Sequence, residues 1–203
     1  MDRRLTAIIT VFAAELFLRV LYPYTHLDTI TYTLLARIAE LFIILGLAYN
    51  ECGLMVKNLK YEIFLGLFIS VIFGSAVLGI NLLLSHFLGS NLLYHVLKRQ
   101  DVNNPLLFFT VACCIAPFVE ELFFRGLIYA WIRQRLSILT SVLLSAVIFA
   151  SMHANISIMS IVQLTGGVIF ALVYEWRRNI WPGYIIHCLA NLGLWILPLM
   201  HTT

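Results

Sequence analysis

The stretch Leu106–Trp131 reads LLFFTVACCIAPFVEELFFRGLIYAW, and its apolar sequence is interrupted by the charged residues Glu120, Glu121 and Arg125. A run of about 20 apolar residues is long enough to cross the hydrocarbon core of a membrane as a helix. A charged side chain at the centre of such a helix costs about 2.5–3.5 kcal/mol on the most lenient scale, so each charge needs a physical reason. The stretch therefore predicts a transmembrane helix whose three charges lie inside a helix bundle.

The composition of the whole chain agrees with a membrane location. The chain has 203 residues, of which 62% are hydrophobic and 11% are charged, and its mean hydropathy is +0.95. Globular chains carry about 25% charged and about 45–50% apolar residues, so the apolar excess must face lipid. The sequence predicts one all-α, polytopic transmembrane bundle, which in a prokaryotic cell is an integral, multi-pass protein of the plasma membrane.

Apolar runs of sufficient length recur along the chain and predict seven transmembrane helices. The segment between Phe87 and Pro105 is too polar to cross the membrane, so we expect a loop with a short interfacial helix there. The seven helices are expected at Leu5–Leu21, Ile30–Ala48, Ile63–Phe87, Leu106–Trp131, Leu139–His153, Ile158–Trp176 and Ile180–Met200.

Basic residues are distributed unevenly between the two ends of these helices. In the seven-helix arrangement, Lys98 and Arg99 fall on one side of the membrane and nine basic residues fall on the other. Cytoplasmic loops are enriched in Lys and Arg, so we expect a cytoplasmic N-terminus and an external C-terminus. Membrane topology thus explains the net charge of +3, and no nucleic-acid partner is expected. The nine residues are Arg3, Arg4, Lys57, Lys60, Arg125, Arg133, Arg135, Arg177 and Arg178.

Two charged pairs in the first two predicted helices have spacings that allow them to neutralise themselves. Glu15 and Arg19 are four residues apart, and Arg37 and Glu40 are three residues apart. Residues at these spacings are neighbours on a helix surface. We therefore interpret both pairs as structural.

The charges of the opening stretch do not balance in this way. Glu121 and Arg125 share a helix face, so Glu121 is the natural partner of Arg125, and Glu120 is left without a counter-ion on its own helix. Burial and a nearby cation act on such a carboxylate in opposite senses, which suits a general base. Pro117 predicts a bend that opens space beside the carboxylates, although packing alone can explain a membrane proline. The alternative is a structural charge cluster that joins two helices.

Two histidines and an amide are candidates for the same polar cavity. Glu120 and His153 lie at nearly equal distances from Leu136, near the turn of their hairpin, so antiparallel helices place them at one depth. Asn191 follows His187 by four residues and shares its helix face. A single membrane histidine is more often a hydrogen-bonded structural residue, but this combination favours a reaction centre.

The spacing of these residues resembles that of the CAAX-protease and bacteriocin-processing family of intramembrane proteases. The resemblance extends over Leu106–Asn191 and implies an endopeptidase that cleaves near the C-terminus of its substrate or next to a membrane segment. Relatives act on prenylated CAAX proteins, peptide pheromones and proteins with C-terminal sorting tails. The matching motifs are E-E-x-x-x-R at Glu120, Glu121 and Arg125, F-x-x-x-H at Phe149 and His153, and H-x-x-x-N at His187 and Asn191.

The resemblance also implies roles for individual residues. Glu120 and His153 would activate a water molecule, and His187 and Asn191 would stabilise the oxyanion formed at the scissile carbonyl. The remaining two motif residues, Glu121 and Arg125, would support the site. Residues 1–105 would then form N-terminal transmembrane helices and the interfacial loop, and residues 106–203 would form the catalytic core.

A zinc-dependent mechanism is an alternative, because members of the family have also been described as metalloproteases. Glu120, His153 and His187 would be the ligands, although the zinc-binding motif H-E-x-x-H is absent. We favour a mechanism without a metal cofactor, since the amide of Asn191 suits an oxyanion hole better than a zinc ligand.

Two further functions are consistent with the sequence. A non-proteolytic membrane scaffold or immunity factor would bind peptides or partner helices, with Gly166, Gly167 and Gly193 at helix contacts. A proton-coupled transporter would use the buried Glu and His residues as a relay, but no inverted repeat supports it. The partners expected for the protease are the lipid bilayer and a protein or peptide with a C-terminal processing signal.

Overall fold

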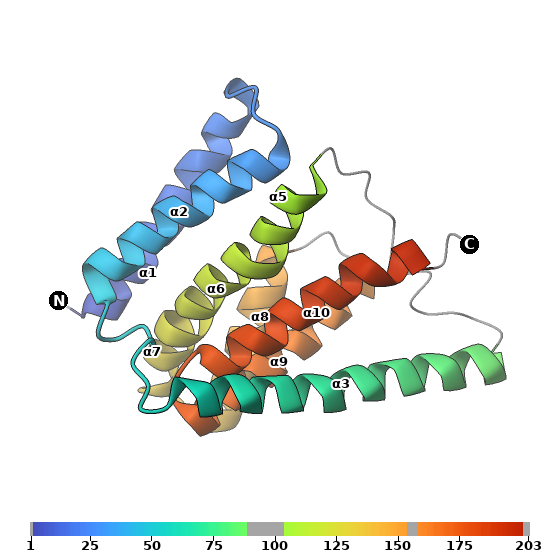
Figure 1. Ribbon diagram of the computed structural model, residues 1–203. Helices are drawn as coiled ribbons and strands as arrows, with labels where there is room; N and C mark the ends of the chain where they lie inside the picture. The colour runs from blue at the N-terminus through green and yellow to red at the C-terminus, as the bar shows by residue number, and fades with distance from the viewer. Residues whose placement is uncertain (1, 89–103, 154–157, 201–203) are drawn as a thin grey trace.

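The computed structural model describes residues 2–88, 104–153 and 158–200, and within these ranges the chain is helical without strands (Figure 1). The five consecutive segments between Pro105 and Arg133 form one continuous stretch, called the central helix below, so seven long helices are present, as the sequence predicts. The loop expected between Phe87 and Pro105 lies almost entirely outside the described residues. The elements are α1 (Arg3–Leu21), η1 (Tyr22–Tyr24), α2 (Thr29–Ala48), α3 (Leu59–Leu88), α5 (Pro105–Phe109), η2 (Thr110–Ile115), α6 (Ala116–Glu121), η3 (Leu122–Tyr129), α7 (Ala130–Arg133), α8 (Ile138–Met152), α9 (Ile158–Arg177) and α10 (Trp181–Met200).

Side-chain caps determine where several helices begin. The carboxylate of Asp28 accepts hydrogen bonds from the first backbone N–H groups of α2, and Ser137 and Asn104 do the same for α8 and α5. Such caps satisfy donors that have no partner inside the helix. Hydrogen bonds from the Thr31 hydroxyl and backbone hold the pKa of the Asp28 carboxyl below its ordinary value.

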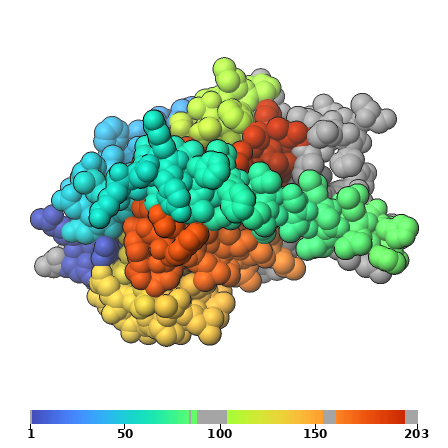
Figure 2. Space-filling model, turned by 60° about the horizontal axis from the view of Figure 1, so that its bottom comes forward, coloured from blue at the N-terminus to red at the C-terminus, as the bar shows by residue number. Residues whose placement is uncertain are grey.

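The central helix forms the core of the bundle, with contacts to α1, α2, α8, α9 and α10. Half of the residues in its most apolar 18-residue stretch are buried, against 17% in the corresponding stretches of α1 and of α2 and 6% in that of α3. Figure 2 shows α3 lying across one face of the molecule, where it packs mainly against α10. The charged residues of the central helix are therefore surrounded by other helices.

The helices have the length and surface expected in a membrane. Among the described residues, four helical stretches are long and apolar enough to cross it: Arg3–Tyr24, Thr29–Ala48, Leu59–Phe87 and Pro105–Arg133. Helix α8 is shorter, and the expected spans at α8, α9 and α10 stay predictions. Large apolar side chains are exposed on the outer faces, as lipid contact requires; they include Leu16, Phe42, Phe64, Val71 and Phe87.

Polar contacts hold four connecting segments together at one end of the bundle. Arg4 donates to the carbonyl of Glu51, Arg135 pairs with Asp2, and Arg177 forms two hydrogen bonds with Glu62. The N-terminus, the α2–α3 loop, the α7–α8 turn and the α9–α10 turn therefore share this basic end. The assignment of Arg125 to it was wrong, because Arg125 is fully buried inside the bundle.

A close approach between chain segments fixes the α2–α3 loop against the central helix. A Cβ atom at Gly126 would lie 2.0 Å from the carbonyl oxygen of Cys52, so only glycine fits at this position. The loop therefore packs directly on the backbone of η3. It holds the C-terminal end of α2 next to the central helix, which carries the carboxylates.

Candidate active site

The structure brings Glu120, His153 and His187 together from three different helices. Glu120 lies on α6 and is buried, and its Oε2 is 3.5 Å from His153 Nε2 and 3.7 Å from His187 Nε2. His153 follows the last residue of α8, and His187 lies on α10. Direct hydrogen bonds between N and O are usually 2.7–3.2 Å long, roughly half an ångström shorter than these separations. A water molecule beside Glu120 and His153 can therefore hydrogen-bond to both atoms from one side.

Both imidazole rings are oriented through their Nδ1 atoms. His153 Nδ1 donates to the carbonyl of Phe149 at 2.8 Å, and His187 Nδ1 donates to Glu121 Oε1 at 3.0 Å. Carbonyl and carboxylate oxygens only accept hydrogen bonds, so Nδ1 carries a proton in both rings. The opposite ring nitrogen, Nε2, consequently faces Glu120 in each case.

Glu121 and Arg125 form a fully buried pair behind His187. Arg125 Nη1 lies 3.3 Å from Glu121 Oε1, and neither residue is exposed. The guanidinium also lies over the rings of Phe149 and Phe170, at 4.5 and 4.9 Å from their centroids. Cation–π contacts of this kind are strongest where water is excluded. Glu121 therefore neutralises Arg125 and holds His187 in one orientation.

The backbone around Pro117 departs from a regular α-helix, and this departure explains the position of Asn191. In η2 the hydrogen bonds span five residues, as from the Ala116 N–H to the carbonyl of Val111. The next bond in this register would join residue 117 to the carbonyl of Ala112, but proline has no N–H. Asn191 Nδ2 donates to that carbonyl instead, at 2.8 Å.

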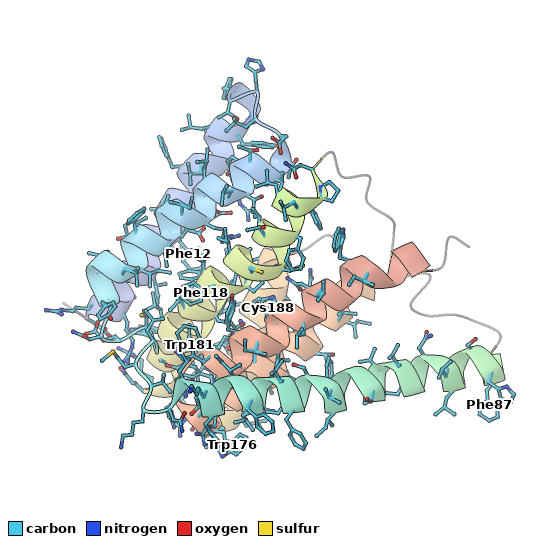
Figure 3. The ribbon with its side chains drawn as sticks, viewed as in Figure 1. Phe12, Phe87, Phe118, Trp176, Trp181 and Cys188 are labelled. Carbon is cyan, nitrogen blue, oxygen red and sulfur yellow. The ribbon has the colours of Figure 1, made fainter. Side chains whose placement is uncertain are left out.

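Asn191 thus docks α10 against the π-helical segment that precedes Pro117 in the central helix. Its amide nitrogen has a second N–H, so the bond to Ala112 and a bond to substrate are compatible. Aromatic packing reinforces the same contact. Phe118 and Trp181, labelled in Figure 3, lie with their ring centroids 5.9 Å apart between α6 and α10.

Arg37 is a charged neighbour of the site that the sequence analysis missed. It pairs with Glu40, as expected, but its Nη2 also lies 3.8 Å from Glu120 Oε1. Glu120 therefore has a counter-ion, supplied by α2 rather than by its own helix. The sequence contains the Arg37–Glu40 spacing, but it does not specify which way α2 is rotated about its axis.

A cavity of about 440 Å³ opens between α1 and α8 next to His153. Apolar and charged side chains both line it, and Phe12, one of the apolar ones, is labelled in Figure 3. The lining residues are Phe12, Glu15, Leu16 and Arg19 from α1 and Ser151, Met152 and His153 at the end of α8.

The three residues that would bind zinc in the metal-dependent alternative do not form a recognisable metal site. In the part of the chain that the structure describes, no group of three or more His, Cys, Asp or Glu side chains is arranged to hold a metal ion. No reaction step is therefore assigned to a metal at Glu120, His153 and His187.

Comparison with known proteins relates this site to membrane peptidases. Residues 102–193 match the family model described as "Type II CAAX prenyl endopeptidase Rce1-like". The chain is 28% identical over 187 residues to the UPF0177 protein YaiH of Lactococcus lactis subsp. lactis (strain IL1403), covering 87% of this chain and 76% of that protein. It is 27% identical over 89 residues to the "Putative membrane peptidase YdiL" of Bacillus subtilis (strain 168), covering 44% of this chain and 36% of that protein. No solved structure matches the chain.

The matched region contains the six residues to which the sequence analysis assigned roles in the site. It begins before the central helix and ends just after Asn191, so it includes the carboxylates, both imidazoles and the amide described above. These matches confirm, for residues 102–193, the resemblance to the CAAX-protease and bacteriocin-processing family of membrane proteases.

Proposed function

We propose that the protein is an intramembrane endopeptidase that hydrolyses a peptide bond near the C-terminus, or in a membrane-adjacent segment, of its substrate. One observation carries the proposal: the buried carboxylate of Glu120 faces two imidazole nitrogens at 3.5 and 3.7 Å. A base that can take a proton from water must lie within hydrogen-bond reach of that water. The arrangement of Glu120 and His153 meets this requirement.

In the proposed reaction, water binds beside Glu120 Oε2 and His153 Nε2. Glu120 removes a proton while the water oxygen forms a bond to the scissile carbonyl carbon. Glu120 then transfers that proton to the leaving amine as the peptide C–N bond breaks, which regenerates the carboxylate. A positioned general base contributes about 10²–10⁴-fold to such a rate.

The oxyanion of the tetrahedral intermediate needs hydrogen-bond donors. His187 can donate from Nε2 when both ring nitrogens are protonated, because Nδ1 already donates to Glu121. The second N–H of Asn191 is the other proposed donor. Removing one oxyanion-hole donor typically lowers kcat by about 10²–10³-fold.

The cavity between α1 and α8 is the proposed binding site for the substrate chain. Phe12, Leu16 and Met152 can hold apolar side chains, and Glu15 and Arg19 can hydrogen-bond to polar groups of the peptide. His153 belongs to the same lining, so a peptide in this cavity lies next to the proposed water site.

The test is cleavage of a peptide library by the purified full chain in detergent, with and without a chelator. We expect cleavage near peptide C-termini or next to apolar segments. This cleavage should survive chelation and should disappear in Glu120→Gln. Glu175→Gln serves as the control, because Glu175 is a partly buried carboxylate that pairs with Arg133 and Arg178 at the basic end.

Three outcomes would overturn parts of this proposal. Activity lost on chelation and restored by zinc would support the metal-dependent alternative. Wild-type cleavage by Glu120→Gln would exclude its role as the base. A folded wild-type protein that binds peptides without cleaving them would support the scaffold or immunity-factor alternative.

A further inference from the structure

We propose that Arg37, on α2, is a positioning residue that holds the carboxylate of Glu120 in its reactive orientation. The inference rests on the proposed function, because it assigns Arg37 a role in the reaction of Glu120. Arg37 lies outside residues 102–193, the part of the chain that matches the family model. The N-terminal helices would then complete the active site rather than only anchor it in the membrane.

The contact uses the oxygen of Glu120 that the imidazoles leave free. Arg37 Nη2 lies 3.8 Å from Oε1, whereas both imidazole nitrogens face Oε2. A carboxylate with charged or polar partners at both oxygens cannot rotate about its terminal bond without losing one of them. Arg37 therefore fixes the plane of the carboxylate and keeps Oε2 toward His153 and His187.

Charge pairing in the surrounding helices leaves Arg37 as a cation that two carboxylates, Glu40 and Glu120, share. Two other arginines of these helices, the exposed Arg19 and the buried Arg125, each pair with a carboxylate on the same helix, four residues away. Arg37 alone among these pairs contacts two carboxylates. The pairs are Glu15 with Arg19, Glu121 with Arg125, and both Glu40 and Glu120 with Arg37.

Burial increases the importance of this contact. The side chain of Glu120 is 9% exposed and that of Arg37 is 22% exposed. In a region of low dielectric, attraction between opposite charges is less screened than in water, and an unpaired buried charge is costly. Helix α2 also packs directly against α6 and η2, so Arg37 is held against the helix that carries Glu120.

The simpler explanation is that Arg37 only neutralises Glu40. Glu40 is 2% exposed and would be left as an uncompensated buried carboxylate if Arg37 were removed. Arg37→Gln alone does not distinguish the two roles, since either one predicts damage. The double variant Arg37→Gln/Glu40→Gln does, because it removes both charges of that pair and leaves Glu120 without Arg37.

The experiment compares kcat and KM for peptide cleavage by Arg37→Gln, Glu40→Gln, the double variant and Arg37→Lys. We expect Glu40→Gln to keep a kcat near the wild-type value. Arg37→Gln and the double variant should both lose about 10–100-fold in kcat with little change in KM, the loss typical of a slightly misplaced catalytic group. Arg37→Lys should recover part of the loss, since lysine keeps the charge without the two-pronged geometry.

Restoration of wild-type kcat in the double variant would overturn the inference, as would an effect confined to KM. If Arg37→Gln does not fold, Arg37→Lys decides: an unchanged kcat contradicts a positioning role, and a reduced kcat at constant KM supports it.

Glu120→Gln separates this inference from the proposed function. If Glu120→Gln is inactive while Arg37→Gln has normal kcat, only the role of Arg37 fails, whereas normal activity of Glu120→Gln removes the basis for both.

Discussion

Glu121 is the residue on which the buried polar network depends most. Its Oε1 accepts a hydrogen bond from His187 and pairs with Arg125, and neither member of the Glu121–Arg125 pair is exposed. Removing one partner of a buried ion pair leaves an uncompensated charge, whereas replacing both partners with apolar residues often preserves stability. Stability and reactivity at this pair can therefore be separated experimentally.

We predict that Glu121→Met lowers the free energy of unfolding by about 3–5 kcal/mol, because it leaves Arg125 buried and unpaired. The double variant Glu121→Met/Arg125→Met should recover much of this loss. Cleavage should remain impaired in the double variant, since His187 has lost the acceptor that orients its ring. Unfolding in detergent and peptide cleavage measure the two effects. A single variant as stable as the wild type would contradict the account.

At the scale of the helices, the irregular hydrogen bonding before Pro117 and the docking of α10 are parts of one feature. The carbonyl of Ala112 lacks a helical donor because residue 117 is proline, and Asn191 supplies the missing hydrogen bond. A buried carbonyl left without a partner costs about 1–3 kcal/mol. Pro117 and Asn191 should therefore be energetically coupled.

We predict that Asn191→Ala destabilises the protein by about 1–3 kcal/mol in the wild-type background. The cost should be smaller when Pro117→Ala is also present, because alanine can donate its own N–H to the carbonyl of Ala112. A double-mutant cycle of unfolding free energies in detergent measures this difference. Strictly additive effects would show that the two residues act independently.

The sequence predicted the helices better than it predicted their internal geometry. Span length and apolar composition are local properties, and the seven expected helices agree with the observed ones to within a few residues. Helix α3 begins at Leu59 rather than Ile63, because Asn58 Oδ1 accepts from the backbone of Tyr61 and Glu62 pairs with Arg177. The η2 and η3 segments on either side of α6 have no comparable local signal.

At the scale of the whole molecule, the sequence indicated that Glu120, His153 and His187 lie together, but it did not indicate how the helices meet around them. The shared depth of Glu120 and His153 follows from their distances to a common turn. The approach of Arg37 to Glu120 depends instead on the rotation of α2 against α6, which spacing within either helix does not determine. Contacts between helices that are distant in sequence therefore could not be predicted from the sequence and are known only from the structure.

The basic end of the bundle gives a test of membrane orientation. We expect this end to face the cytoplasm, since basic loops are retained there. In a chain without its four native cysteines, Lys57→Cys should resist a membrane-impermeant thiol reagent in intact cells and react after permeabilisation. His26→Cys, in the α1–α2 turn at the opposite end, is the matched control and should react in intact cells. The reverse pattern would invert the proposed topology.

The most direct test of the central claim is the turnover number of Glu120→Gln, measured beside Glu175→Gln in the same detergent and with the same peptide. The substitution keeps the size of the side chain but removes its ability to accept a proton. We predict a kcat lower by about 10²–10⁴-fold in Glu120→Gln, with unfolding behaviour like that of the wild type. A folded Glu120→Gln variant that turns over as fast as Glu175→Gln would contradict the claim that Glu120 is the general base.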